Sequence, residues 1–501
     1  MSNSSRVIFN TGVQYIRTLI SVSIGIYSSR IVLNALGVEE FGVYNLIAGV
    51  IVMLSFINAS LAVTTQRFLS YYQEHSLTSL REIFNTSLWI HCGLGALLFV
   101  SIEIVGIFLF DGFLKIPEES LSAAKVIYHF MGVTLFLTLL STPFYALLIA
   151  HENILYVSII QIVDAICKLG IAITISFFEE NRLMYYGLLI SSIVVIDLVC
   201  YYIYCHNRYA ECKIISVSFF QKKWFFKILE FAGWNIYGSG CMIVRTQGIA
   251  VLLNKFFGAS INAAYAIALQ LQGGISVLST SILQAIRPQI MKAEGANDRQ
   301  RMFYLAELAS KFSFFLLSMV VIPCIFEMEV ILKAWLKEIP EYTILFCQCV
   351  LIAALLDQLT IALGDANQAV GNIKMYTFVV QTVKMLTIPF AMGALLLGYS
   401  PTWVMGIYML FEGICSLLRL PLLKKSTGLS IKQFVINVFC REILPFGLFV
   451  MITYCISHYL QASYKFLLTF LVSISIYMLL IYSLGLSKQE KKFFIRLFFR
   501  R

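Results

Sequence analysis

The chain has 501 residues, of which 59% are hydrophobic and only 13% are charged, and its formal net charge is +10. Soluble domains carry roughly a quarter charged residues, so this composition excludes a soluble enzyme and predicts that much of the surface faces lipid. The basic residues lie in short segments between apolar runs, which is a pattern of membrane topology that requires no nucleic acid.

Apolar runs recur along the whole chain. A bilayer core of roughly 30 Å needs about 20 apolar residues in a helix. We count about fourteen such runs and predict an all-α integral membrane protein with that number of transmembrane helices. The runs are centred on Leu19, Val52, Leu97, Leu135, Ile166, Ile193, Ile243, Leu271, Leu316, Ala354, Leu386, Met409, Val450 and Ile474. The first and seventh are the least hydrophobic, which favours positions that line an interior.

Lys and Arg gather in alternate connecting segments. If the N-terminus is inside, the segments after the second, sixth, eighth and twelfth runs and the C-terminal tail are basic, whereas the opposite segments are acidic. Cytoplasmic loops of membrane proteins carry an excess of Lys and Arg, so we expect both termini in the cytoplasm and an even number of spans. The tail at 487–501 alternates basic and aromatic residues. It is either a basic amphipathic helix on the membrane surface or a topology signal alone.

An internal similarity links residues 34–74 with residues 254–294 at an offset of about 220. Six predicted spans separate the copies, so both enter the membrane from the same side and the two halves are parallel repeats. We expect a six-helix lobe over 1–215, a second over 216–430, an extra helix pair with a basic tail over 431–501, and a cavity between the lobes. The matching pairs are Asn34 with Asn254, Gly37 with Gly258, Tyr44 with Tyr265, Arg67 with Arg287, and Glu74 with Glu294.

Several arginines lie inside predicted spans, where ionisable side chains are costly and usually face a cavity or a partner. The first span carries Arg17 and Arg30, and the seventh carries Arg245 with Gln247 close by. If both spans border the cavity, the three arginines make a cationic lumen for an anion. A guanidinium suits phosphate especially well, because its planar fork matches the phosphate oxygens. The alternative is that Arg17 and Arg30 extend to the inner and outer membrane surfaces.

Acidic residues also lie within spans. Asp164 and Lys168 are at positions i and i+4 of the fifth span, where they either neutralise each other or line the cavity and help to bind substrate or couple to protons. Proton or sodium coupling stays open, because no feature of the sequence selects one carboxylate over another. The other intramembrane charges are Asp197 and Asp357, which are candidates for ion coupling, and Lys384 and Glu412.

Signatures of enzymes and metal sites are missing from the sequence. The twelve cysteines lack the paired spacing of a zinc site. The phosphate-binding GxxxxGK[ST] loop, the GxSxG elbow and the HExxH helix do not occur. We therefore expect no cofactor, metal or catalytic site.

Residues 10–68 contain an arginine in the first span, then an LG…FG.Y turn, then a span that ends at QRF. These features are Arg30, Leu36–Gly37, Phe41–Gly42, Tyr44 and Gln66–Arg67–Phe68. They resemble the start of bacterial polysaccharide flippases of the Wzx type. Four later segments are also similar to this family: 231–240 (FAGWNIYGSG), 286–298 (IRPQIMKAEGAND), 311–323 (KFSFFLLSMVVIP) and 336–347 (LKEIPEYTILFC).

The resemblance implies a fold of two six-helix lobes and an extra helix pair, related to multidrug and toxin extruders and to the peptidoglycan-precursor flippase. It implies an undecaprenyl-pyrophosphate-linked oligosaccharide as substrate, moved between the leaflets of the bacterial plasma (inner) membrane for the assembly of O-antigen of lipopolysaccharide, capsule or exopolysaccharide. By similarity, cationic lumen residues would hold the pyrophosphate and sugar. The assignment to Arg17, Arg30 and Arg245 rests on position, because the binding residues of this family are not fixed by a motif.

We therefore expect a flippase that works by alternating access, with membrane lipids, a polysaccharide polymerase and a chain-length regulator as its partners. Two other functions stay open. A cation-coupled exporter of small amphipathic compounds would place acidic residues in the lumen. A membrane-embedded glycan polymerase or ligase would need a large outer loop with catalytic residues, and the sequence contains no loop of that size.

Overall fold

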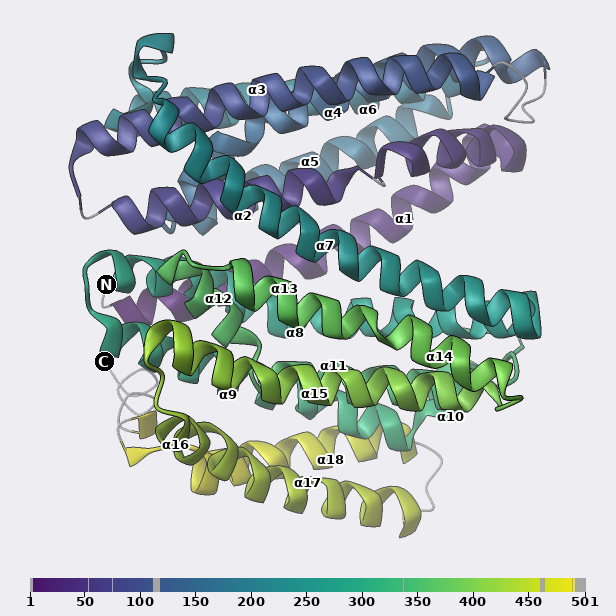
Figure 1. The fold of residues 1–501 in the computed structure, drawn as a ribbon. Coiled ribbons are helices and arrows are strands. Elements are labelled where there is room, and N and C mark those ends of the chain that lie inside the picture. The colour runs from purple at the N-terminus through teal and green to yellow at the C-terminus, as the bar shows by residue number, and fades with distance from the viewer. Residues whose placement is uncertain are drawn as a thin grey trace, which may run out of the picture. The chain divides into compact units, whose positions relative to one another are not determined.

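The computed structural model describes residues 3–52, 54–73, 75–110, 118–336, 338–459, 465–488 and 490–491. These residues form helices and connecting segments with no strand (Figure 1), which confirms the predicted all-α class. Contacts divide the chain into two compact units. We call them the N-terminal unit (Ile8–Ile236) and the C-terminal unit (Tyr237–Arg501 with Met1–Val7). The predicted lobes at 1–215 and 216–430 and the helix pair at 431–501 stay predictions.

The N-terminal unit is built around α4. Its elements are α1 (Asn3–Val52), α2 (Ser55–Tyr72), α3 (Leu77–Phe108), α4 (Glu118–Ala150), α5 (Ile154–Ile175), α6 (Arg182–Arg208), two short turns η2 (Ala210–Cys212) and η3 (Val217–Phe219), and the first part of α7 (Lys222–Phe257). Helix α4 packs against α2, α3 and α6, and most of its apolar stretch is buried, whereas α3, α5 and α6 leave large apolar side chains exposed. Such outward faces suit contact with lipid.

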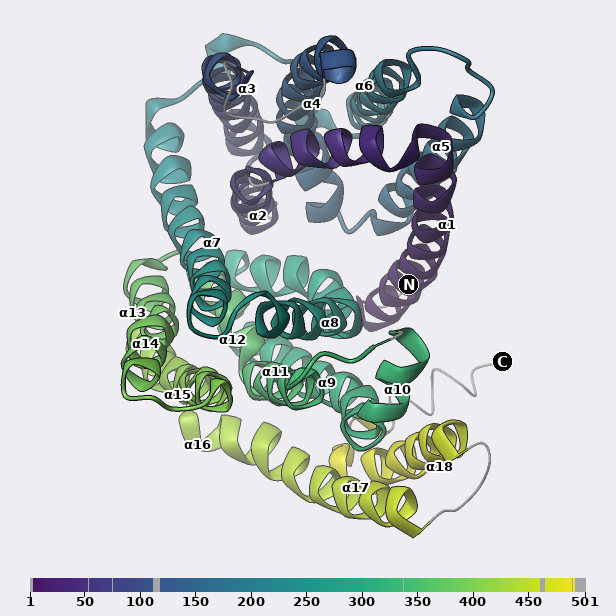
Figure 2. The same ribbon diagram turned by 90° about the vertical axis from the view of Figure 1, so that its right-hand side faces the viewer.

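The C-terminal unit is built around α9. After the rest of α7 it contains α8 (Ala259–Gly295), α9 (Arg299–Phe326), α10 (Met328–Trp335), α11 (Thr343–Gln358), α12 (Ile361–Val370), α13 (Lys374–Met385), α14 (Thr387–Leu396), α15 (Pro401–Thr427), α16 (Ile431–Phe434), the π-turn η4 (Val435–Phe439), α17 (Cys440–Tyr459), α18 (Lys465–Leu480) and the π-turn η5 (Ile481–Gly485). Helix α9 packs against α8, α11, α12 and α17, and α17 lies beside α18 (Figure 2).

Twelve helices in the described parts of the chain are long and apolar enough to cross a membrane, and α11 with α12, which meet at a bend of 41°, make a thirteenth. The predicted run centred on Val52 falls on the end of α1 and on α2, and residue 53 between them lies outside the described residues. The structure thus supports a multi-pass membrane protein and shows twelve to thirteen candidate spans in its described residues, close to the predicted number of about fourteen. The cytoplasmic position of both termini stays a prediction, and residues 492–501 of the tail lie outside the described part.

The two units share a backbone feature at the positions that the sequence repeat pairs. Helix α1 is interrupted at Gly37 (φ 76°, ψ 171°), and α7 is separated from α8 by Gly258 (φ 86°, ψ −174°). This conformation is essentially restricted to glycine. The next helix of each unit also begins alike, because Ser76 and Asp298 both cap it through a side-chain oxygen that accepts from the backbone N–H three residues on. These features support the predicted repeat, although Glu74 lies outside the described residues.

Candidate functional site

A pocket of about 730 Å³ lies within the N-terminal unit and is lined by α1, α5 and α6. Gln161, Asp164 and Lys168 are spaced by three and four residues along α5, so they share one face of that helix. Arg17 and Ser21, four residues apart on α1, share a face in the same way. The structure thus brings three of the predicted lumen residues, Arg17, Asp164 and Lys168, to a single pocket.

Among the described residues, the side chain of Arg17 has only neutral partners. Its Nη1 donates a hydrogen bond to Gln161 Oε1, and its Nη2 donates to Thr18 Oγ1 at 3.1 Å. Its Nε is buried and has no hydrogen-bond partner among the described residues. Since neither partner carries a charge, the positive charge of Arg17 is not neutralised by an ion pair, which suits the binding of an anion.

The second charged group of the pocket is an ion pair. Lys168 Nζ donates to Asp164 Oδ2 at 2.9 Å, and Lys168 is the more exposed of the two. The two residues therefore neutralise each other and also line the pocket, whereas their predicted role in binding substrate or coupling to protons stays a prediction. Because the charges of Asp164 and Lys168 cancel, the charge of Arg17 makes the pocket positive overall. The buried hydroxyls of Ser21 and Ser28 have no hydrogen-bond partner in the described parts of the chain, so they add two uncommitted donors.

Three other predicted residues do not line this pocket. Arg30 is exposed on α1, and Gln247 is exposed on α7. Asp197 is partly buried on α6, where it interacts electrostatically with Asp164 and Lys168. The lumen role of Arg30 and Gln247 and the coupling role of Asp197 stay predictions.

The C-terminal unit holds a buried network of charges on four helices. Arg245 Nη1 on α7 donates to Glu412 Oε1 on α15 at 2.5 Å. The other oxygen of Glu412 lies 2.8 Å from Lys384 Nζ on α13. Lys384 Nζ also donates to Asp357 Oδ1 on α11 at 3.0 Å, and Arg419 Nη2 on α15 donates to the same oxygen at 2.5 Å. Along this path three cations alternate with two carboxylates.

This alternation explains how five charged side chains are tolerated inside an apolar bundle, since each carboxylate lies between two cations. Arg245 is only 1% exposed, its Nη2 donates to the Tyr408 hydroxyl at 3.2 Å, and its Cζ lies 4.5 Å from the centre of the Tyr408 ring. The network ties α7, α11, α13 and α15 together. The predicted roles of Arg245 in a lumen and of Asp357 in ion coupling stay predictions.

Sequence reasoning missed three members of these sites. Gln161 is a neutral residue that no charge-based search selects, although it lies three residues before Asp164 on the same face of α5. Tyr408 and Arg419 share a face of α15 with Glu412, because they lie four residues before it and seven residues after it. Helical spacing from a predicted charge was the signal that would have found all three.

Solved structures with a similar fold are membrane transporters. They include a MATE protein in its bent conformation (TM-score 0.74, 11% identity, 86% of this chain and 98% of that chain) and the MATE transporter ClbM in complex with Rb⁺ (TM-score 0.71, 14% identity, 86% and 96%). A MOP superfamily transporter from Pyrococcus furiosus is also similar (TM-score 0.69, 11% identity, 84% and 94%). At these identities the likeness shows the fold alone, and it confirms the predicted likeness to the multidrug-and-toxin-extrusion fold.

The sequence itself matches a family model described as polysaccharide biosynthesis protein over residues 5–294, which is more than half of the chain. A search of curated proteins found no match. The family match covers α1 to α8 and so includes every element that lines the Arg17 pocket. The chain therefore belongs to the polysaccharide biosynthesis protein family, as its resemblance to Wzx-type polysaccharide flippases predicted, and it has the fold of the MATE exporters.

Proposed function

We propose that this protein is a flippase that moves an undecaprenyl-pyrophosphate-linked oligosaccharide from the inner to the outer leaflet of the bacterial plasma membrane. The family and the fold support a membrane exporter or flippase. The finer proposal rests on one observation, which is the uncompensated guanidinium of Arg17 in a polar pocket among membrane-length helices. The product would serve the assembly of O-antigen, capsule or exopolysaccharide.

The chemistry of the pocket suits the head of such a substrate. A pyrophosphate linkage is anionic at neutral pH, and charge-assisted hydrogen bonds from a guanidinium to phosphate oxygens are among the stronger polar contacts in proteins. The hydroxyls of Ser21 and Ser28 supply further donors for phosphate or sugar oxygens. Tyr44 and Tyr186, which meet edge to face, line the same pocket and offer apolar ring surface to a sugar. The polyprenyl tail would stay in lipid.

The alternative of a cation-coupled drug exporter is less well supported by this pocket. Such an exporter is expected to hold its cationic substrate or coupling ion on free carboxylates, and Asp164, the only carboxylate of the pocket in the described residues, is already paired with Lys168. Translocation needs no covalent step. A polysaccharide polymerase and a chain-length regulator would act on the flipped product and are the partners we propose. Coupling to protons or sodium through Asp197 or Asp357 is part of the same proposal.

The proposal is tested by Arg17→Gln in proteoliposomes that contain a fluorescent polyprenyl-pyrophosphate oligosaccharide. Substrate that reaches the outer leaflet is quenched by a reagent that cannot cross the membrane. We expect the flipping rate to fall at least about tenfold, because each charge-assisted hydrogen bond contributes roughly 1.5–3 kcal/mol. Arg208→Gln is the matched control, since Arg208 is exposed on α6 of the same unit and outside the pocket.

Both variants should keep the thermal unfolding midpoint of the unmodified protein, because the partners of Arg17 are neutral and partly exposed. Flipping by Arg17→Gln at the unmodified rate would overturn the proposed role of the pocket. Equal slowing in Arg17→Gln and Arg208→Gln would mean that a general loss of positive charge, and not this site, causes the effect.

A further inference from the structure

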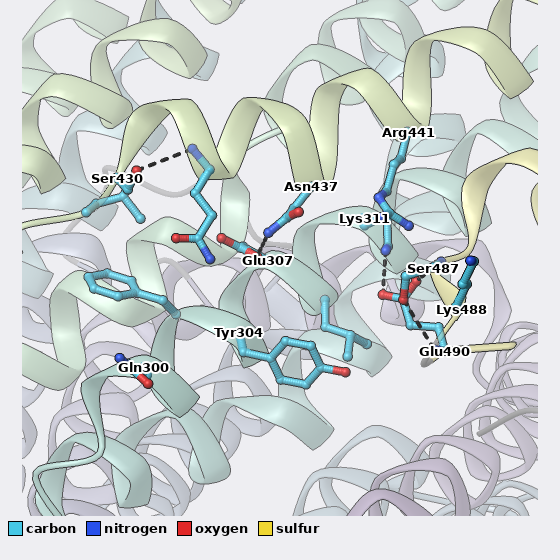
Figure 3. Close-up of a pocket in the computed structure, with 14 residues that line it drawn as sticks. Gln300, Tyr304, Glu307, Lys311, Ser430, Asn437, Arg441, Ser487, Lys488 and Glu490 are labelled. Carbon is cyan, nitrogen blue, oxygen red and sulfur yellow. Dashed lines mark hydrogen bonds and ion pairs between the residues drawn. The ribbon is translucent and has the colours of Figure 1, made fainter. Parts of the chain in front are cut away.

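A second pocket, of about 750 Å³, lies within the C-terminal unit where α9 meets α16, α17 and the segment after η5 (Figure 3). Its lining includes residues near the start of α9, the start of α16 and the end of η5. Those three points are the ends of the candidate spans Arg299–Phe326, Ile431–Tyr459 and Phe466–Gly485. In a membrane crossed by these three spans, the pocket would lie toward one surface, near the lipid headgroups.

Internal pairing accounts for three of the five charged side chains in this pocket. Lys311 Nζ donates to Glu490 Oε1 at 2.5 Å, and both side chains are buried. Glu490 also accepts from the backbone N–H of Ser487 at 2.6 Å. Glu307 accepts a hydrogen bond from Asn437 Nδ2 at 2.9 Å. The two carboxylates of the pocket are thus already occupied as acceptors.

Two cations are left over. Arg441 and Lys488 flank the Lys311–Glu490 pair in Figure 3, and neither has a hydrogen-bond or ion-pair partner among the described residues. Arg441 also lies close enough to Lys311 for the two positive charges to repel each other. The residues that line the pocket comprise three cations and two carboxylates, which gives the lining a formal charge of +1. Glu442 does not line the pocket, but it lies close enough to Lys311 to attract it.

We propose that this pocket binds a phosphate-bearing anion at the membrane surface, and that the phosphodiester of an anionic phospholipid is its source. The charge of a phosphodiester would neutralise the excess charge and relieve the repulsion between Arg441 and Lys311. Basic pockets between membrane helices are a known type of headgroup site. Tyr304 supplies a hydroxyl donor, and Phe303 and Leu429 supply apolar surface for glycerol and acyl carbons.

This site is independent of the proposed flippase activity, because none of its residues belongs to the Arg17 pocket or to the buried charge network. Its expected effect is on the anchoring of the C-terminal helix pair. The ligand would contact α9, α17 and the segment after η5 at once, so binding would stabilise their packing.

The test uses the purified full-length protein in phosphatidylcholine nanodiscs. One series adds phosphatidylglycerol and another adds inorganic phosphate at constant ionic strength, and bound lipid and the thermal unfolding midpoint are measured. The double variant Arg441→Gln/Lys488→Gln removes the two free cations. Lys424→Gln/Lys425→Gln is the matched control, because these exposed lysines in the last turn of α15 lie outside the pocket and carry the same charge.

We expect phosphatidylglycerol to raise the unfolding midpoint of the unmodified protein and of the control. Its apparent affinity should fall at least about tenfold in the Arg441→Gln/Lys488→Gln variant. If inorganic phosphate produces the same site-dependent rise and phosphatidylglycerol does not, the anion site stands and its source is soluble. Equal effects in both double variants, or no anion effect at all, would overturn the proposal. If the double variant fails to fold, Lys488→Gln alone makes the same test at an exposed position.

Discussion

Removal of the Glu412 carboxylate is expected to lower the unfolding free energy of the C-terminal unit strongly, because this carboxylate pairs with two buried cations. This carboxylate is 3% exposed and lies between Arg245 at 2.5 Å and Lys384 at 2.8 Å. Loss of one partner of a buried ion pair costs about 3–5 kcal/mol, because the remaining charge stays buried without compensation. Glu412→Ala leaves Arg245 with two neutral acceptors, the Tyr408 hydroxyl and the Met242 sulfur, so we expect a loss near the upper end, about 5 kcal/mol of unfolding free energy.

Truncation of Arg245 should lower the unfolding free energy less than truncation of Glu412. In Arg245→Ala the carboxylate of Glu412 keeps Lys384 as its partner, so we expect a loss near the lower end of the range, about 3 kcal/mol. The double variant Arg245→Met/Glu412→Leu removes both charges and keeps most of the volume. Lys384 then still has Asp357. The double variant should therefore cost less than Glu412→Ala alone, which is the signature of a coupled pair.

Unfolding free energies can be measured by titrating the purified protein with sodium dodecyl sulfate in mixed micelles and following tryptophan fluorescence. The matched control is Lys333→Ala, which breaks an exposed i,i+4 pair with Glu329 and should therefore cost far less than Glu412→Ala. A loss in Glu412→Ala no larger than in this control would refute the reasoning. So would a loss in Arg245→Ala/Glu412→Ala equal to the sum of the losses in Arg245→Ala and Glu412→Ala.

Three further predictions concern other parts of the chain. Gly258→Ala forces alanine into a conformation that only glycine adopts readily, so the unfolding free energy should fall by about 1–3 kcal/mol, and an unchanged value would contradict the strain argument. Glu442 is buried, and its carboxylate oxygens have no hydrogen-bond partner among the described residues. Because an uncharged side chain costs less to bury than a charged one, Glu442→Gln should raise the thermal unfolding midpoint. A lowered midpoint would indicate that Glu442 has an ionic role. Burial raises the pKa of Glu211 in η2, but its hydrogen bonds, chiefly that with His151, and the charges of His151 and Arg81 together outweigh burial, so the pKa lies below the usual value. The stability that ionised Glu211 contributes is therefore present above its unfolded pKa and lost as pH falls through the folded pKa, so the midpoints of unmodified protein and Glu211→Gln should differ at pH 7 and converge below about pH 4.

The fold was largely predictable because its signals are local in sequence. Apolar runs of membrane length predict helices whatever their partners are. The match between Gly37 and Gly258 is likewise visible in the sequence alone, and the structure gives both glycines the same backbone conformation. The pair of Asp164 and Lys168 was predictable for the same reason, since a spacing of four residues places both on one helix face.

The pairing of side chains across helices could not be predicted from the sequence. Arg245 and Glu412 are 167 residues apart, and nothing in hydropathy or spacing selects Glu412 over Asp357 as the partner of that arginine. The same holds for Arg17, whose partner Gln161 is 144 residues away and carries no charge. An intramembrane arginine is recognised from one stretch of sequence, but its electrostatic environment depends on the helices that pack around it.

The two units differ at one pair of positions that the repeat relates, Gly25 and Arg245. Asn34 and Asn254 are paired at an offset of 220, and the same offset carried back along the two helices places Arg245 opposite Gly25. Gly25 lines the pocket of the N-terminal unit, and a side chain added there would meet open space. At the equivalent place in the C-terminal unit the long side chain of Arg245 extends to Glu412 and closes an ion-pair network. Gly25 thus lies beside a polar pocket, whereas Arg245 lies in a buried network of ion pairs.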